Sequence, residues 1–351
     1  MASNPVNMKI LVIGPSWVGD MVMSQSLYKT LHTLHPGCQI DVLAPAWCKP
    51  VLERMPEVRE ALEMPFGHGE FNFSGRWKLG KSYKSKEYTH AFVLPRSAKS
   101  AFIPFFAGVP NRIGWKGEMR YGLLNDIRAD RTVFQYMVER YVGLAYSNDS
   151  MLEKTSIETV DFPSLTVDEN NQASCLERFG VDSQQAMIGI CPGAEFGPAK
   201  RWPEKHYANV AEKLILEGNQ ILLFGGPKDR EVTQSIKEAL PVALQDKCFN
   251  LAGETSLVDA IDLLAACHTV FSNDSGLMHV AAAVGTNIVA IYGSSSPKYT
   301  PPLSGRVRMV NTDIGCRPCF KRECPFGHLK CLKDLPPSQV MEAYGELSSV
   351  N

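Results

Sequence analysis

Short apolar runs without alternation recur along the chain, each followed by a polar corner and a helical stretch. In the clearest case, Thr269–Asn273 predicts a buried strand, residues 276–284 a short helix, and Ile288–Tyr292 a second buried strand. Uninterrupted Val, Ile and Phe are typical of parallel strands that are covered on both faces. We therefore expect the corner between this first strand and the helix to lie at the carboxyl edge of a parallel sheet, where ligands bind in open α/β sheets.

That corner, Asn273-Asp274-Ser275-Gly276, joins three N-cap residue types to a glycine that lets the backbone approach a ligand. A helix that begins there directs unpaired N–H groups and a partial positive charge at the ligand crevice, which stabilises a phosphate. The residues alone leave two interpretations open, an anion site or a plain turn between strand and helix. His279 follows on the first helical turn, and a helix histidine is more often a surface or core residue than a catalytic one.

The same plan of strand, corner and helix occurs in both halves of the chain, which predicts an α/β fold built from doubly wound parallel sheets. The expected strands are Met8–Gly14, Gln39–Pro45 and Ala91–Pro95 in the first half, and Met187–Cys191, Ile221–Phe224 and Val307–Val310 in the second. A polar stretch, Asp161–Gly180, separates the halves. We expect an N-terminal domain over residues 8–165, a linker over 166–185, a C-terminal domain over 186–335 and a final helix within 336–351. Residues 1–7 are polar and look like a non-native extension.

Further candidate side chains sit at other corners that would share a carboxyl edge. Asp20 follows the first strand, where a phosphate-binding loop would need Lys and Ser or Thr; a carboxylate there repels phosphate. It is either a helix cap or a general base. In the second half, Lys200 lies in a Gly/Pro corner and is placed to neutralise a pyrophosphate. Asp229 and Glu231 begin the helix after Gly226, as ribose ligands or as helix caps.

Composition narrows the class of protein. The chain has 351 residues, 44% of them hydrophobic and 21% charged, with a net charge of −1, which is typical of a folded protein of two domains. The sequence contains no run of about 18 apolar residues, so it predicts no membrane-spanning helix. Between residues 76 and 131, however, twelve Lys and Arg face four acids. This is either a solvated surface or a landing surface for an anionic partner, and no nucleic-acid motif accompanies it.

Ten cysteines in a chain without a signal peptide predict reduced thiols in the cytoplasm. Four of them are clustered, at Cys316, Cys319, Cys324 and Cys331. Free thiols and a structural tetrahedral metal site both remain open, because the spacing departs from a repeated C-x2-C. We expect no catalytic role for this cluster.

The glycine-aspartate pair after the first strand, the PGA…KRWP corner, the LAGETSL…DLLAAC segment and FSNDSGLMHVAAAVGTNIVAIYG together resemble the heptosyltransferases of lipopolysaccharide core synthesis, glycosyltransferase family nine. The resemblance runs from Met8 to near the C-terminus. It implies a GT-B fold, in which two Rossmann-like domains face each other across a cleft and the final helix returns to the N-terminal domain. It also implies an inverting transfer of L-glycero-D-manno-heptose from ADP-heptose to the first heptose of the inner core.

By this resemblance, Asp20 is the general base, and the donor diphosphate is held by Lys200, Asp274, Ser275 and Gly276, with His279 nearby. Asp229 or Glu231 would be at the nucleotide because of their position at the start of a helix. Arg96, Lys99 and Arg120 would bind the acceptor, a phosphorylated Kdo-lipid A core carrying one heptose. The resemblance implies no required cofactor, no nucleic-acid partner, and a cytoplasmic protein at the inner face of the cytoplasmic membrane.

Other functions remain to be separated from this one. A heptosyltransferase I-type enzyme, or another ADP- or UDP-sugar transferase, would use the same corners. A nucleotide-dependent oxidoreductase or epimerase would need a G-x-G-x-x-G turn after the first strand, and the chain offers only Gly14 and Gly19 there. A non-catalytic anion-binding protein would need the basic stretch but not Asp20. Among these functions, only the inverting glycosyltransferase predicts a preference for ADP over NAD and UDP.

Overall fold

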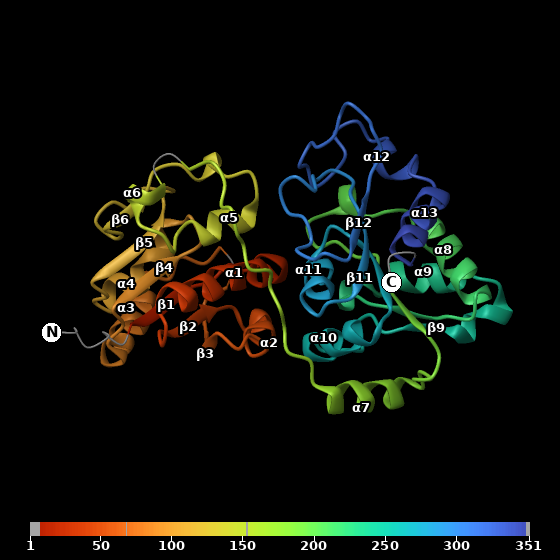
Figure 1. Ribbon diagram of the computed structural model, residues 1–351, viewed down its shortest axis with the longest axis horizontal. Helices are drawn as coiled ribbons and strands as arrows, with labels where there is room; N and C mark the ends of the chain where they lie inside the picture. Colours follow the sequence, from red (N-terminus) through yellow and green to blue (C-terminus); the bar gives the residue numbers. More distant parts are fainter. Residues whose placement is uncertain (1–7, 68, 152–153, 349–351) are drawn as a thin grey trace. The chain divides into compact units, whose positions relative to one another are not determined.

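The computed structural model describes residues 8–67, 69–151 and 154–348 and divides into two compact units, with the boundary between Pro163 and Ser164. Residues 1–7, expected to be a non-native extension, lie outside the described ranges. Each unit contains one sheet of six parallel strands with helices on both faces (Figure 1). The predicted α/β class is therefore confirmed in both halves.

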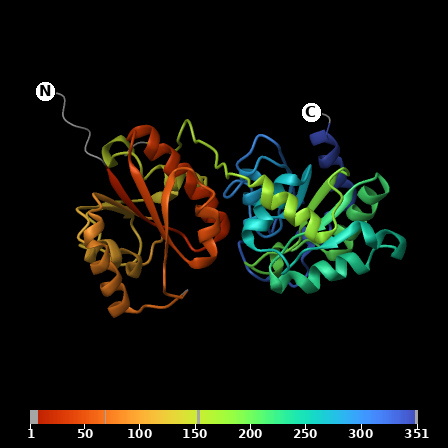
Figure 2. The same ribbon diagram turned by 90° about the horizontal axis from the view of Figure 1, so that it is seen from below.

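The N-terminal sheet has the strand order β3-β2-β1-β4-β5-β6. Its strands are β1 (Lys9–Ile13), β2 (Gln39–Ala44), β3 (Val58–Glu63), β4 (His90–Val93), β5 (Asn111–Trp115) and β6 (Asp126–Arg128). One group of helices contains α1 (Val18–Leu34), α2 (Lys49–Leu52) and α5 (Met137–Val142), and a second contains α3 (Phe73–Ser82) and α4 (Phe102–Phe106). Seen from below in Figure 2, these groups lie on opposite sides of the sheet. The short α6 (Asn148–Met151) follows.

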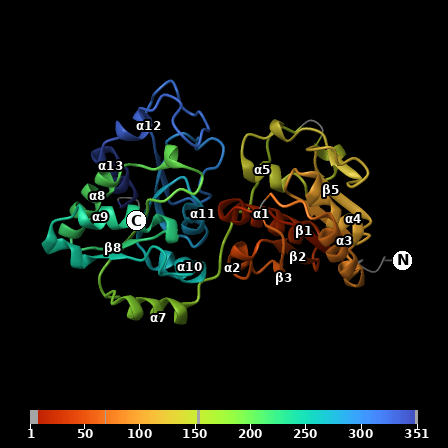
Figure 3. The ribbon, with the colours of Figure 1, turned by 180° about the vertical axis from the view of Figure 1, so that it is seen from behind.

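The C-terminal sheet repeats this plan with the order β12-β11-β10-β7-β8-β9. Its strands are β7 (Met187–Cys191), β8 (Gln220–Leu223), β9 (Cys248–Asn250), β10 (Thr269–Asn273), β11 (Asn287–Ile291) and β12 (Val307–Val310). Helix α8 (Glu204–Leu216) contacts both α9 (Arg230–Glu238) and α13 (Pro337–Ser348), and α10 (Leu257–Ala266) contacts both α7 (Glu169–Phe179) and α11 (Gly276–Ala283). Figure 3 shows the two groups on different sides of the strands. The short α12 (Lys330–Lys333) precedes α13.

The central strands are buried over their whole length, as their unbroken apolar sequences predict. Every residue of β7, β10 and β11 is buried, and Thr269 pairs in register with Ile188 on one side and Asn287 on the other. Burial on both faces excludes water from the ladder and fixes the ends of these strands relative to one another. The polar residues that follow the strands are thereby held at one edge of the sheet.

Two expected boundaries are wrong. The final helix was expected to return to the N-terminal domain, but α13 buries Val340, Ala343 and Leu347 in the core of the C-terminal unit, where Tyr344 packs on Phe271. Its apolar face matches the sheet that precedes it in the chain. The predicted linker over residues 166–185 contains α7, which packs on α10 and belongs to the C-terminal unit.

A pair of polar contacts holds α7 in place. The side-chain amide of Asn171 donates to Asp262 over 2.8 Å, and Arg178 pairs with Asp259 at 3.0 Å.

Within the described ranges, no helix is long and apolar enough to cross a membrane.

Candidate active site

The strand order of each sheet reverses at one point, between β1 and β4 in the N-terminal unit and between β7 and β10 in the C-terminal unit. Ligands of open α/β sheets bind outside the carboxyl ends of the strands at such a switch point. Asp20 follows β1, and the corner Asp274-Ser275-Gly276 follows β10. The sequence-predicted residues therefore lie where the fold of each unit favours a binding site.

In the C-terminal unit, Lys200 reaches the β10–α11 corner. Its ammonium Nζ lies 2.6 Å from Oδ2 of Asp274, and both side chains are largely buried. Ser275 is the N-cap residue of α11, but its side chain makes no capping hydrogen bond, and Gly276 is the first helical residue. The corner thus brings together an ion pair and the N-terminus of a helix, and the lysine and the unpaired N–H groups are groups of the kind that bind a phosphate. The predicted proximity of Lys200, Asp274 and Ser275 is confirmed as geometry.

His279 is buried on the same helix, with 5% of its surface exposed. Burial is the main cause that lowers its pKa to about 4; the charge of Lys200 lowers it further and that of Asp274 opposes the shift. The imidazole is therefore neutral at neutral pH. A neutral ring can donate one hydrogen bond beside the Lys200–Asp274 pair without adding charge.

Asn273 joins three segments at this edge, a role that its sequence position did not predict. Its amide oxygen accepts from the Trp202 backbone N–H at 3.1 Å and from the Tyr207 hydroxyl at 2.8 Å. Its amide nitrogen donates to the Pro192 carbonyl over 2.5 Å. The end of β7, the segment that enters α8 and the end of β10 are thus locked together. A buried Asn after an apolar strand was the available signal, because a buried amide is normally fully hydrogen-bonded.

Asp229 lies at the β8–α9 corner and serves that corner structurally. Its carboxylate accepts from the Gly226 N–H at 3.0 Å and stands 3.7 Å from the Arg201 guanidinium. A Cβ on Gly193 would lie 2.5 Å from the Asp229 carboxyl group, so the corners after β7 and β8 meet in close contact. Glu231 is exposed on the first turn of α9. Of the two acids, Asp229 is the one that borders the corner after β7.

The corner after β11 contributes two further candidates, Ser294 and Ser295. Their hydroxyl oxygens are buried and have no hydrogen-bond partner within the part of the chain that the structure describes. The Ser294 backbone N–H donates to the Ala199 carbonyl at 3.1 Å, which ties this corner to the one that carries Lys200. Sequence reasoning missed both hydroxyls, although three serines after a buried strand were the signal. Buried hydroxyls without partners can serve an oxygen-rich ligand.

The Lys200 corner rests on the cysteine-bearing segment that follows β12. Ala199 N–H donates to the Arg322 carbonyl at 3.0 Å, and Gly197 adopts a φ of 153°. A Cβ at Gly197 would come within 2.5 Å of that same carbonyl oxygen. The rings and charges also interleave, because Lys200 and Arg322 both lie over the Phe196 ring, at 5.0 and 5.4 Å. The segment therefore forms the support behind Lys200.

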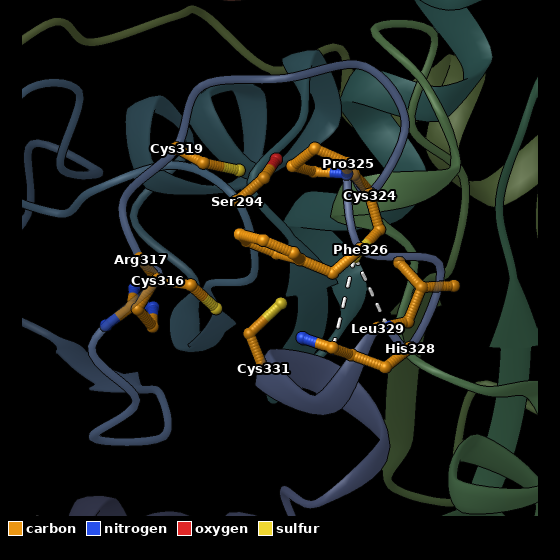
Figure 4. Close-up of a pocket in the computed structure, with 11 residues that line it drawn as sticks. Ser294, Cys316, Arg317, Cys319, Cys324, Pro325, Phe326, His328, Leu329 and Cys331 are labelled. Atoms are coloured by element: carbon orange, nitrogen blue, oxygen red, sulfur yellow. Dashed lines mark hydrogen bonds between the residues drawn. The ribbon is translucent and has the colours of Figure 1, made fainter.

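Four thiols of this segment line a single pocket together with His328 and Phe326, and Figure 4 shows their side chains. The Leu329 backbone N–H donates to the Cys324 sulfur at 3.5 Å and is the main cause that lowers the pKa of this thiol. All ten cysteines of the chain are free thiols in the structure. Among the described residues, no three His, Cys, Asp or Glu side chains are arranged to hold a metal ion. The two interpretations that the spacing left open, free thiols and a structural metal site, both stay predictions.

Asp20 lies on the first turn of α1, at the carboxyl edge of the N-terminal sheet. Its charge contributes, after burial, to the raised pKa of the Cys48 thiol, which places the two side chains near each other. The indole N–H of Trp47 donates to the Ser16 carbonyl at 2.8 Å, which ties the corner after β2 to the one that carries Asp20. Trp47 and Trp17 leave about half of their surface exposed here. These two exposed aromatic rings lie at the corners next to Asp20, a feature that the sequence analysis missed.

Several of the basic residues between residues 76 and 131 are buried, so they do not belong to a charged surface. Arg120 is 1% exposed and donates to the carbonyls of Pro95 and Trp115, so the prediction that it binds an acceptor is wrong. Burial lowers the pKa of Arg120 to about 10. Arg76 and Arg128 are also buried. A count of charges cannot separate a guanidinium that fastens loops from one that faces a ligand.

The other two predicted acceptor residues remain accessible at the corner after β4. Arg96 is exposed, and its carbonyl accepts from the Glu118 N–H at 3.1 Å. Lys99 is partly exposed and donates to the Glu70 carbonyl at 3.2 Å. Both lie beside the switch point of the N-terminal sheet, and their binding of an acceptor stays a prediction.

The chain is similar to known proteins over almost its whole length. Lipopolysaccharide heptosyltransferase 2 of Escherichia coli K12 is 52% identical over 342 residues, which cover 97% of this chain and 98% of that protein. Lipooligosaccharide heptosyltransferase 2 of Haemophilus influenzae is 50% identical, over 97% and 99% of the two chains. The solved structure of the E. coli ADP-heptose lps heptosyltransferase II superposes with a TM-score of 0.88 at 50% identity, covering 97% and 98%.

The likeness extends to the fold, which is GT-B-like, with two six-stranded parallel sheets each flanked by helices. The sequence pattern of glycosyltransferase family 9 (heptosyltransferase) matches residues 76–330, more than half of the chain. Together with the near full-length relatives, this match shows that the protein is a glycosyltransferase and belongs to family 9, the heptosyltransferases.

Proposed function

We propose that the protein is an inverting transferase that moves L-glycero-D-manno-heptose from ADP-heptose to the first heptose of the lipopolysaccharide inner core. The observation that carries this proposal is the similarity at about one residue in two, over almost the whole length of both chains, to heptosyltransferases 2. The geometry of the C-terminal corner supports a donor with a charged diphosphate.

In the proposed donor site, Lys200 and the N-terminus of α11 at Ser275-Gly276 bind the diphosphate. As the bond between the anomeric carbon and the phosphate oxygen breaks, negative charge gathers on the departing ADP, and these groups stabilise it. His279 stays neutral beside them. Asp229 or Glu231 binds the ribose hydroxyls, and Asp229 is the stronger candidate because its carboxylate borders Gly193.

Asp20 is proposed as the general base. Its carboxylate takes the proton from the acceptor hydroxyl as that oxygen attacks the anomeric carbon from the face opposite to the phosphate, which inverts the configuration. The reaction then balances with one new glycosidic bond, one proton on Asp20 and ADP as the leaving group. We assign no required cofactor to this chemistry.

The proposed acceptor is a phosphorylated Kdo-lipid A core that carries one heptose. Arg96 and Lys99 at the corner after β4 supply charges of the sign that its carboxylates and phosphate require. Since such an acceptor is anchored in lipid, we propose that the protein acts in the cytoplasm, at the inner face of the cytoplasmic membrane, and that nucleic acid is not its partner.

The direct test is incubation with ADP-heptose and a core acceptor carrying one heptose, followed by mass measurement of the acceptor and assay of ADP. We expect a gain of one heptose unit and one ADP for each transfer. Transfer only to a heptose-free acceptor would assign a heptosyltransferase I-type activity, and a preference for UDP-sugars would assign another transferase. Nucleotide binding without any transfer would favour a non-catalytic protein.

A further inference from the structure

The N-terminal unit exposes a cluster of aromatic rings that the proposed chemistry does not use. Its members come from α3, the residues just before it and α4, and their exposed fractions are 55% for Phe71, 47% for Phe73, 44% for Trp77 and 41% for Phe105. Phe73 packs edge-to-face on Phe102 at 5.3 Å and on Phe106 at 5.6 Å. We call Phe71, Phe73, Trp77 and Phe105 the aromatic patch. Contiguous exposed apolar surface of this kind marks an interaction site.

The backbone is built to present these rings. Asn72 adopts a left-handed conformation with φ 33° and caps α3 by accepting from the Gly75 N–H at 3.0 Å. A non-glycine residue rarely adopts this conformation. Its effect is to bring Phe71 alongside Phe73, with ring centroids 6.3 Å apart and planes within 18°. The patch is therefore a structured feature rather than a loose loop.

A buried guanidinium fixes the same segment. Arg76, 4% exposed, donates to the carbonyls of Phe71 at 2.7 Å, Glu70 at 3.1 Å and Lys99 at 3.4 Å. Gly80 then allows α3 to lie against α4, since a Cβ there would meet the Ile103 carbonyl at 2.8 Å. The inward face of α3 is thus fixed against α4 and against the residues before the helix, and the opposite face of α3 is exposed to solvent.

Charge surrounds the patch on the outward face of the helix. Phe73, Trp77 and Lys81 follow each other at intervals of four residues, so they share one face. Lys78 and Lys84 are exposed nearby. Residues 71–106 contain seven Lys and Arg and one acid, Glu87, but Arg76 is buried and Lys86 pairs with Glu60 at 2.6 Å. The charge that counts here is therefore that of the exposed Lys78, Lys81 and Lys84. Aromatic rings with lysines around them are the composition of segments that lie in the interface of an anionic bilayer.

We propose that the aromatic patch and the lysines Lys78, Lys81 and Lys84 dock the protein on an anionic lipid bilayer, with the rings at the level of the headgroups. The rings supply apolar area and the ammonium groups pair with lipid phosphates while their stems cover apolar surface. A second copy of this chain fits less well, because the same lysines would face one another. The inference deepens the proposed function, since a lipid-anchored acceptor is reached from such a surface.

Binding of the full chain to acceptor-free vesicles tests the surface without any transfer. We expect flotation with vesicles of phosphatidylcholine and phosphatidylglycerol, weaker flotation with phosphatidylcholine alone, and loss at high salt. Replacing Lys78, Lys81 and Lys84 together by Gln should weaken binding to the anionic vesicles by about 100-fold. Replacing Phe73 and Trp77 by Ser should abolish flotation even at low salt.

Matched controls come from α8 of the other unit, where Lys205 and Lys213 are exposed and Leu216 is 70% exposed. The variants Lys205→Gln/Lys213→Gln and Leu216→Ser should float as the parent protein does. In Trp77→Phe, flotation should persist while quenching of tryptophan emission by brominated lipid falls. This conservative variant separates loss of the ring's contact from loss of folding.

Equal flotation of the parent protein and the patch variants would overturn the inference, as would no flotation of the parent. A dimer in sedimentation that Phe73→Ser/Trp77→Ser dissolves would instead assign the patch to self-association. Transfer to a delipidated acceptor should be unchanged in the patch variants and should fall when the acceptor is in vesicles. If transfer to the delipidated acceptor is absent in the parent while flotation stands, the proposed function fails and the docking surface remains.

Discussion

Lys200 Nζ lies 2.6 Å from Asp274 Oδ2 at the carboxyl edge of the C-terminal sheet, and the two charges are largely shielded from water. The cation proposed to receive the diphosphate is therefore paired with a carboxylate of the same corner. An ion pair held this far from water gains its stability from mutual contact, and removing one member exposes the cost of burying the other. This arrangement fixes the position of the ammonium group at the corner.

Removal of Lys200 should impair both donor binding and folding. Lys200→Ala should lower transfer by about 100-fold or more, because the departing diphosphate loses its cation. The same variant should also lower the free energy of unfolding by about 3 kcal/mol, because Asp274 is left as a buried, unpaired carboxylate. Transfer rates, ADP titration and urea unfolding measure these effects.

The double variant Lys200→Ala/Asp274→Ala separates the two roles. It should recover most of the lost stability, since neither charge then remains buried, but it should not recover transfer. Recovery of transfer along with stability would contradict the assignment of Lys200 to the diphosphate.

Asp20 should be required for the chemical step but not for the nucleotide. Asp20→Asn preserves shape and removes the base, so transfer should fall by about 100- to 10,000-fold while ADP binds with unchanged affinity. The matched control is Glu169→Gln, an acid on the first turn of α7 that is exposed and away from both switch points. Transfer by Asp20→Asn at the parent rate would remove this residue as the base.

Stability should fall as the pH drops from about 6.5 to about 4, owing to His279. Because burial depresses its pKa in the folded state to about 4, the unfolded chain binds the proton first over this window. The unfolded state therefore gains stability as the pH falls, by on the order of 3 kcal/mol once both pKa values have been passed. Urea midpoints over this pH range measure the effect.

The assignment to His279 can be checked with two variants. His279→Gln should flatten the acid limb of the stability profile, whereas His268→Gln, on an exposed histidine before β10, should retain it. An unchanged acid limb in His279→Gln would transfer the effect to other groups.

Asn273→Ala should be among the more destabilising substitutions in the C-terminal unit. It leaves the Trp202 N–H, the Tyr207 hydroxyl and the Pro192 carbonyl without their partner, which costs about 3 kcal/mol or more. Asn209→Ala on the exposed side of α8 should change the free energy of unfolding by less than about 0.5 kcal/mol. Similar unfolding midpoints for the two variants would show that the hydrogen bonds of the Asn273 side chain contribute little to the free energy of unfolding.

Cys324 should be the first thiol to be alkylated in the native protein. The Leu329 N–H stabilises its thiolate and the side chain is partly exposed, whereas burial raises the pKa of Cys191 and Cys267. Brief treatment with iodoacetamide followed by peptide mass mapping gives the order of reaction. The variant Cys324→Ser should remove the fast phase, and a first label on Cys191 would contradict the geometry.

Local patterns predicted much of the C-terminal sheet because its strands carry continuous apolar runs. Strands β7 and β10 have the expected bounds, and Gly285 after α11 adopts a left-handed φ of 82°, as a glycine beyond a helix end commonly does. Ser256 and Asp259 form a capping box at the start of α10, a local pattern of the same kind. These features depend on residues that are neighbours in the sequence.

What the sequence did not reveal depends on partners far apart in the chain. The amide of Asn273 is explained by Pro192 and Tyr207, more than 60 positions away. Arg120 looked like an acceptor ligand because charge alone does not show that two carbonyls enclose it. The apolar face of α13 fits either sheet by composition, and only packing on the C-terminal core selects one.

The contact between Gly197 and the Arg322 carbonyl has a practical consequence for how this enzyme loses activity. Lys200 is supported by the cysteine-bearing segment after β12, which has few regular hydrogen bonds and several accessible sulfurs. Heat or alkylating agents can therefore displace the Lys200 ammonium group while both sheets stay folded. Inactivation should accordingly precede the loss of circular dichroism, and the donor should protect against it.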